Sequence, residues 1–149
     1  MRSVLIALSA LLSATLPAAA TGGFSCLAGD QSLSFKAEAA TSRGMGGVIL
    51  DLRASIAVKL EGISDDLRKV ALDGALTHSW IDGDELKLQF YHERSVEPFG
   101  SLDLVVETAA VDEGAYRGHY ALTIFDTPAS EEADREMWTA EGYATCYAE

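Results

Sequence analysis

Residues 101–125 read SLDLVVETAAVDEGAYRGHYALTIF, and this stretch decides the fold. Apolar and polar side chains alternate on both sides of the Asp-Glu-Gly loop at residues 112–114, as they do in strands with one buried face. A three-residue loop with glycine in third place is typical of a β-hairpin. Such a hairpin places Leu104 opposite Leu122 on the inner face. A shift of one residue would reverse the two faces, so the pattern specifies the register.

The outer face of this hairpin carries a second prediction, since the same register sets Glu107 opposite His119. An acidic side chain opposite a histidine predicts a cross-strand charge pair, which stabilises a sheet by about 0.2–1 kcal/mol. We therefore expect both side chains on the solvent side of the hairpin.

The same alternation recurs along most of the chain. A second short loop at residues 81–83 would pair His78 with Leu86 and turn Trp80 toward the inside. The alternation predicts strands near residues 24–28, 31–39, 47–60, 69–80, 85–93, 101–111, 115–125 and 138–147.

Two of these segments carry finer predictions. In the long strand at 47–60, the even-numbered residues, including Leu50, are expected to face the core and Ile49 to face outward. Between this strand and the next, Ser64 is followed by two acidic residues. This order predicts a short helical turn capped by the serine side chain.

Successive strands joined by short loops pair in an antiparallel meander. We therefore predict an all-β fold of about eight strands that form a small barrel, with a two-sheet β-sandwich as the alternative. The size and strand count resemble those of small ligand-binding barrels such as lipocalins and avidin. This resemblance concerns architecture, and architecture does not specify function.

Cys26 and Cys146 are the two cysteines of the chain, one near each end. In an oxidising compartment, an even number of cysteines predicts a disulfide. A bond between these two joins the terminal strands, and closing a loop of about 120 residues stabilises a fold by about 4–5 kcal/mol. Two free thiols and a disulfide between chains are the alternatives.

The N-terminus supports export. Arg2 precedes an apolar run from Val4 to Leu16, and three alanines end at Ala20, the order of a signal peptide with its cleavage site. The run is too short to span a bilayer. We predict that residues 1–20 are removed and that residues 21–149 form a single domain in the bacterial periplasm or the secreted space, with no membrane span.

The charge balance restricts the partners. The formal net charge of the chain is −12, and removal of Arg2 makes it −13. Nucleic acids require clustered Lys and Arg to neutralise their phosphates, so we expect no nucleic-acid partner. An acidic protein also repels anionic membranes.

Motifs for chemistry are missing from the sequence. The three histidines lack the spacings of zinc motifs, and no G-x-S-x-G nucleophile elbow occurs. By alternation His78 and His92 point inward. We therefore expect no catalytic residue, no metal and no cofactor.

Five residues are candidates for contact with a ligand or partner. Arg43 and Met45 lie in a glycine-rich loop that would form a rim or lid. Trp80, His92 and Trp138 are predicted on the inner face, where aromatic side chains either enclose a ligand or fill a core.

These observations favour a non-enzymatic binding or structural module, with a protein or a small apolar ligand as its partner. The alternative is an inhibitor of an exported hydrolase, which would insert residues 41–47 or 95–100 into its target. A carrier of a small apolar molecule inside the barrel is a further possibility. The sequence does not predict the oligomeric state.

Overall fold

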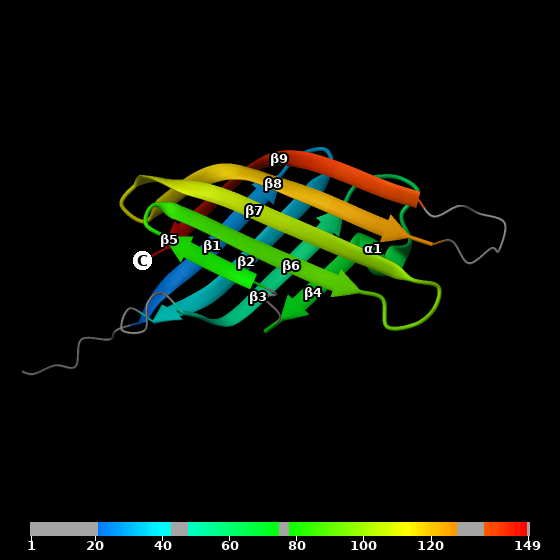
Figure 1. Cartoon of the computed structure of the whole chain (residues 1–149), viewed down its shortest axis with the longest axis horizontal. Helices are drawn as coiled ribbons and strands as arrows, with labels where there is room; N and C mark the ends of the chain where they lie inside the picture. The colour runs from blue at the N-terminus through cyan, green and yellow to red at the C-terminus, as the bar shows by residue number, and fades with distance from the viewer. Residues whose placement is uncertain (1–20, 43–47, 75–77, 128–135, 149) are drawn as a thin grey trace, which may run out of the picture.

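The computed structural model describes residues 21–42, 48–74, 78–127 and 136–148, which form one antiparallel sheet of nine strands and one short helix (Figure 1). The predicted signal peptide, residues 1–20, lies outside the described residues. In chain order the elements are β1 (Thr21–Gly29), β2 (Leu33–Ser42), β3 (Val48–Val58), α1 (Asp65–Arg68), β4 (Lys69–Asp73), β5 (His78–Asp82), β6 (Glu85–Glu93), β7 (Gly100–Asp112), β8 (Ala115–Asp126) and β9 (Glu136–Ala148).

The sheet curls into a half-barrel with strand order β4-β3-β2-β1-β9-β8-β7-β6-β5. The predicted all-β meander is therefore confirmed, with one difference. The expected strand at 69–80 is two strands, β4 and β5, and these form the two edges of the sheet. The first and last strands pair with each other in the middle.

The predicted disulfide is confirmed. Cys26 of β1 lies directly opposite Cys146 of β9, with a Cα–Cα distance of 4.0 Å, and the two residues are bonded. Both side chains are buried on the inner face. The bond joins the two strands that connect the first half of the meander to the second.

The inside of the curl is filled by apolar side chains. Phe35 of β2 and Phe90 of β6 meet with ring centroids 5.0 Å apart, although their strands are not neighbours in the sheet. This contact therefore crosses the interior. The α1 helix packs against β3, β4 and β7 and buries Leu67 completely. The largest fully buried side chains are Tyr120, Phe90, Leu33, Ile56, Leu67, Leu88, Leu102, Leu104, Leu122, Ile124, Val106 and Cys26.

A hydrogen bond joins a buried tyrosine to an exposed aspartate at the margin of this interior. The Tyr120 hydroxyl donates a hydrogen bond of 2.5 Å to a carboxylate oxygen of Asp30, which follows β1. Burial, and then the hydrogen bond to Asp30, raises the pKa of Tyr120. Gly142 of β9, the register partner of Tyr120, leaves the room that the ring and the carboxylate occupy.

The hairpin of β7 and β8 has the predicted register. Leu104 lies opposite Leu122, and Glu107 lies opposite His119. The loop between the two strands is shorter than the predicted three residues, because Asp112 pairs with Ala115. A register shift between Ala110 and Asp112 marks a β-bulge. The bulge absorbs one residue and leaves the alternation intact.

The predicted register of the β5–β6 hairpin is wrong. Trp80 pairs with Lys87 on the outer face, and the Trp80 side chain is 62 % exposed. The turn contains two residues rather than three, and Gly83 takes a positive φ of 58° at the first of them. One residue fewer in the loop reverses the face that Trp80 and His78 occupy, so His78 also faces outward.

The prediction for the start of β3 is also wrong. A register shift between β2 and β3 accompanies Asp51, whose φ of 49° is unusual for a non-glycine residue. This bulge reverses the alternation before it. Leu50 is consequently exposed, whereas Ile49 packs against the core.

The predicted helical turn is confirmed as α1, but its predicted cap is wrong. The Ser64 side chain makes no capping hydrogen bond. Its hydroxyl donates instead to a carboxylate oxygen of Asp126, at 2.5 Å. The serine therefore attaches the start of the helix to the end of β8 instead of capping the helix. Among the residues described, no helix is long and apolar enough to cross a membrane.

Candidate functional site

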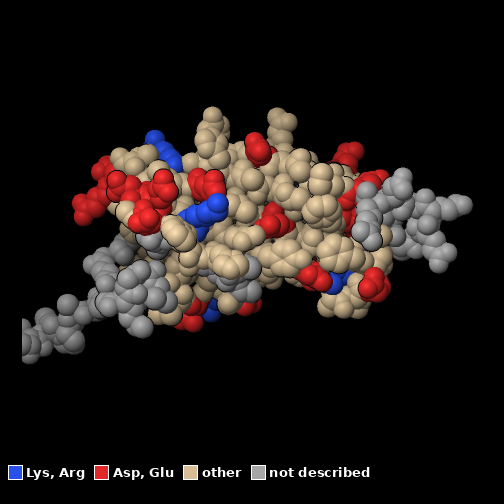
Figure 2. Space-filling view, viewed as in Figure 1, with Lys and Arg blue, Asp and Glu red and all other residues tan. Residues whose placement is uncertain are grey.

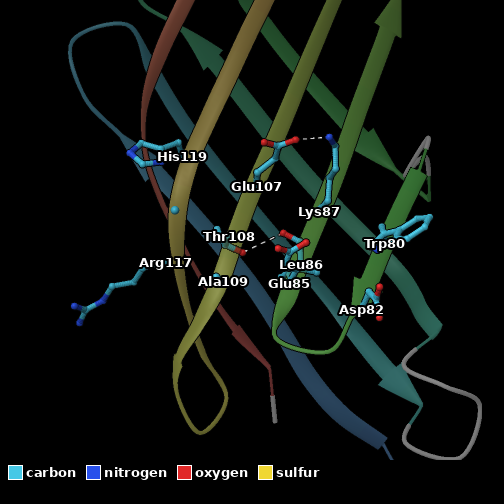
Figure 3. Close-up of a pocket in the computed structure, with 11 residues that line it drawn as sticks. Trp80, Asp82, Glu85, Leu86, Lys87, Glu107, Thr108, Ala109, Arg117 and His119 are labelled. Atoms are coloured by element: carbon cyan, nitrogen blue, oxygen red, sulfur yellow. Dashed lines mark hydrogen bonds and ion pairs between the residues drawn. The ribbon is translucent and has the colours of Figure 1, made fainter.

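A row of five side chains crosses the outer face of the sheet. Trp80 pairs with Lys87, Lys87 with Glu107, Glu107 with His119, and His119 with Tyr143. The row therefore passes through β5, β6, β7, β8 and β9 in turn. Each of its five side chains is exposed. Figure 3 shows Trp80 at one end of the view, with the Lys87–Glu107 pair between it and His119.

A depression of about 670 Å³ lies along this row, and we call it the outer groove. Its volume is within the range of small-molecule sites, about 300–1,000 Å³. The next row of register partners, nearer the hairpin turns, contributes Asp82, Glu85, Ala109 and Arg117 to the lining. Ala109 is a small residue between charged neighbours.

Contacts between side chains order the middle of the row. Lys87 and Glu107 form an ion pair between neighbouring strands. The rings of His119 and Tyr143 lie with their centroids 5.0 Å apart. An exposed ion pair contributes at most about 1 kcal/mol to stability, so it can exchange partners with a ligand at little cost. Among the residues described, Asp82, Glu85 and Arg117 take part in no ion pair.

Acidic residues gather at the hairpin end of the groove. Figure 2 shows red atoms gathered at the end of the molecule where the β5–β6 and β7–β8 hairpins turn, with few blue ones among them. The exposed acidic residues of these two turns are Asp82, Asp84, Glu85, Asp112 and Glu113.

The structure does not bring the predicted contact residues together. Trp80 lies on the outer face and lines the groove, whereas it was expected inside. His92 and Trp138 share one inner row, but Leu102 and Ile124 stand between them. Both are half-buried, and Trp138 packs over Gly62 next to α1.

Arg43 and Met45 lie outside the described residues. The sequence interpretation did not select Lys87, Arg117 or Tyr143. The predicted charge pair of Glu107 and His119 is wrong, because Glu107 pairs with Lys87 and the His119 ring lies against Tyr143. The predicted position of the two residues opposite each other was nevertheless the available clue, because it marked one outer row that includes Tyr143 and Lys87 once the neighbouring strands are aligned.

A second feature lies at the opposite end of the sheet. Arg94, at the start of the β6–β7 loop, donates hydrogen bonds to Asp66 of α1, to Asp126 of β8 at 2.9 Å and to the carbonyl of Pro98 at 2.8 Å. The Arg94 side chain is 9 % exposed. This buried guanidinium ties the loop to the helix and to the sheet. The loop nevertheless exposes Val96.

The same network shifts the pKa values of its carboxylates. The hydrogen bond from Arg94 lowers the pKa of Asp66. Burial raises the pKa of Asp126, but the hydrogen bonds from Ser64 and Arg94 outweigh it and leave that pKa lowered. Both carboxylates are therefore held in the charged form that the guanidinium requires.

Within the described part of the chain, no group of three or more His, Cys, Asp or Glu side chains lies close enough to hold an ion.

Comparison of the chain with family models, with curated proteins and with solved structures found no match.

Proposed function

We propose that this chain is a non-enzymatic binding module of the bacterial periplasm or the secreted space, and that the outer groove is its contact surface. The observation that carries the proposal is Trp80. Its side chain is 62 % exposed at the rim of the groove, where it packs against no core. Large exposed aromatic side chains beside charged residues are typical of binding surfaces.

The compartment is argued from the sequence and supported by the cysteines. An apolar run with an adjacent cleavage pattern favours export. The disulfide of Cys26 and Cys146 is of a kind that persists in oxidising compartments. A module that works there meets partners from the cell envelope or the medium.

Because side chains fill the interior, we place the contact surface on the outer face of the sheet. Phe35, Phe90 and Tyr120 occupy the space that a carrier of a small apolar molecule would keep for its ligand. The outer groove, in contrast, is open to a partner without any change in the core.

Capture of partners with matched variants tests the proposal. Tagged wild-type protein, Trp80→Ala and Leu50→Ala are exported by the native host and isolated after chemical cross-linking. Leu50 is the control because it is 44 % exposed on the outer side of β3, in a different part of the sheet. Neither change removes a buried side chain, so both variants should fold.

The expected result is a partner that is retained by Leu50→Ala and lost or reduced at least tenfold with Trp80→Ala. Quantitative mass spectrometry measures this ratio. Equal recovery of a partner by both variants would overturn the assignment of the groove as the contact surface, and so would recovery of bare protein when no soluble ligand binds through Trp80 either.

A second candidate function rests on the β6–β7 loop. The Arg94 side chain fixes this loop through its hydrogen bond to the Pro98 carbonyl, whereas Val96 and Phe99 of the same loop are exposed. A loop that is fixed before it binds loses little conformational entropy, as is typical of protein inhibitors of hydrolases. Panels of exported proteases and glycosidases should then contain one enzyme that wild-type protein inhibits and Val96→Asp does not. Undiminished activity of every enzyme at micromolar protein would reject this candidate.

A further inference from the structure

We infer that the ligand of the outer groove is a neutral oligosaccharide, an inference that rests on the groove being the contact surface. The evidence is the order of side chains along the cross-strand row. Aromatic rings stand at its two ends, and groups that donate and accept hydrogen bonds stand between them.

The two rings present flat apolar surfaces to solvent. Trp80 is 62 % exposed and Tyr143 is 80 % exposed. Leaving such rings in water forgoes the hydrophobic stabilisation that burial provides. The ring of a sugar has one face of C–H groups, which covers an aromatic ring while its hydroxyl groups remain at the edge. Two exposed rings therefore suit two sugar units of one chain.

The register sets the length of the ligand. Trp80 and Tyr143 are separated by four steps between neighbouring strands. Adjacent strands are about 4.8 Å apart, which gives about 19 Å along the sheet. A single sugar cannot contact both rings, whereas an extended chain of several sugars can. The groove occupies the part of this span between Trp80 and His119.

The charges of the groove disfavour anionic and apolar ligands. Its lining contains three carboxylates, from Asp82, Glu85 and Glu107, and two cations, from Lys87 and Arg117. An anionic ligand would meet the excess of carboxylates. An apolar ligand would desolvate these charged groups without replacing their hydrogen bonds.

Sugar hydroxyl groups match this mixture of charges. Each hydroxyl donates one hydrogen bond and accepts others. It can donate to the carboxylate of Glu107 and accept from the ammonium group of Lys87 at the same time. A row of alternating acceptors and donors is therefore complementary to a neutral polyhydroxyl chain.

Intrinsic fluorescence provides the test. The chain has two tryptophans, and Trp138 is half-buried next to α1, away from the groove. Trp138→Phe leaves Trp80 as the single tryptophan, so its emission reports on the groove. This protein is titrated with soluble hexasaccharides of β-1,4-glucose, β-1,3-glucose, α-1,4-glucose, β-1,4-xylose and β-1,4-N-acetylglucosamine, and calorimetry repeats each titration on the wild type.

We expect saturable binding of at least one hexasaccharide. In calorimetry, Trp80→Ala should weaken it at least tenfold and Tyr143→Ala at least threefold, whereas Leu50→Ala should leave it unchanged. The disaccharide of the same sugar should bind at least tenfold more weakly, because it cannot reach from Trp80 to Tyr143. Absence of binding by every hexasaccharide at millimolar concentration, or equal binding by Trp80→Ala, would overturn the inference.

The two experiments distinguish rejection of the sugar ligand from rejection of the groove as the contact surface. A protein partner, or a basic peptide, that requires Trp80 in the capture experiment while no hexasaccharide binds would reject the sugar ligand and keep the groove as the contact surface. Failure of both experiments would reject both.

Discussion

Replacing Gly142 by alanine should destabilise the protein far more than the addition of one methyl group suggests. Gly142 of β9 lies opposite Tyr120, and the turn residue Asp30 reaches the same place. A Cβ atom at Gly142 would overlap a carboxylate oxygen of Asp30 and lie 2.5 Å from a ring carbon of Tyr120. The tyrosine is 1 % exposed, so its ring has no free space into which to move.

Two terms determine the magnitude. Forcing a methyl group into a well-packed site costs about 1–3 kcal/mol. Displacing the carboxylate breaks the hydrogen bond from the Tyr120 hydroxyl, and a hydrogen bond to a charged group is worth about 1.5–3 kcal/mol. Partial relaxation reduces the sum, so we expect the unfolding free energy to fall by about 3–5 kcal/mol.

Urea unfolding followed by circular dichroism measures this loss. Gly29→Ala is the matched control, because a Cβ atom at Gly29 would have no neighbour within 4 Å. The control should remain within about 0.5 kcal/mol of the wild type. A Gly142→Ala protein within about 1 kcal/mol of the wild type, with an unchanged denaturant slope, would refute the reasoning about the Tyr120–Asp30 contact.

Three further predictions concern stability. Leu104→Ala should lower the unfolding free energy by about 2–5 kcal/mol, since Leu104 is fully buried, whereas Leu50→Ala at an exposed position should change it little; equal urea midpoints would contradict this difference. Reducing the disulfide should lower the unfolding free energy by about 4–5 kcal/mol, because the bond closes a separation of 120 residues; identical thermal melts with and without reductant would count against it. Stability should also decrease as the pH falls from about 5 to about 2. The pKa of Asp126 is lower in the folded state than in the unfolded state, so its ionised form stabilises the fold at any pH above the unfolded-state pKa. This contribution is lost as the pH falls through the folded-state pKa. Asp126→Asn should show a flatter acid dependence, and an unchanged pH profile of the urea midpoint would show that this carboxylate does not carry the effect.

The alternation of side chains was sufficient to predict most of the sheet. Burial on one face of a strand requires a period of two, and this period is visible in residues 101–125 without any coordinates. The hairpin register followed, because a slip would have buried Glu107 and exposed Leu104. The pairing of the two cysteines followed from their number and from the predicted export.

The candidate site was predictable only in part. Glu107 and His119 were placed correctly as neighbours on the outer face. Trp80 was selected as a contact residue but assigned to the inner face. The sequence of the β5–β6 turn permits both a two-residue and a three-residue loop, since Gly83 can take a positive φ in either.

What the chain of residues decided, before any folding, is most of the strands, their antiparallel pairing and the bond between Cys26 and Cys146, but not the division of residues 69–80 between the two edges of the sheet. These depend on local periodicity and on chemistry that each segment carries alone. What required the folded molecule is the choice of face at β5 and at the start of β3, where the loop length and the bulge at Asp51 each reverse the alternation. At β5 the two-residue turn at Gly83 sets Trp80 opposite Lys87 on the outer face, and at β3 the register shift against β2 sets Ile49 against the core, so each choice depends on pairing with a neighbouring strand.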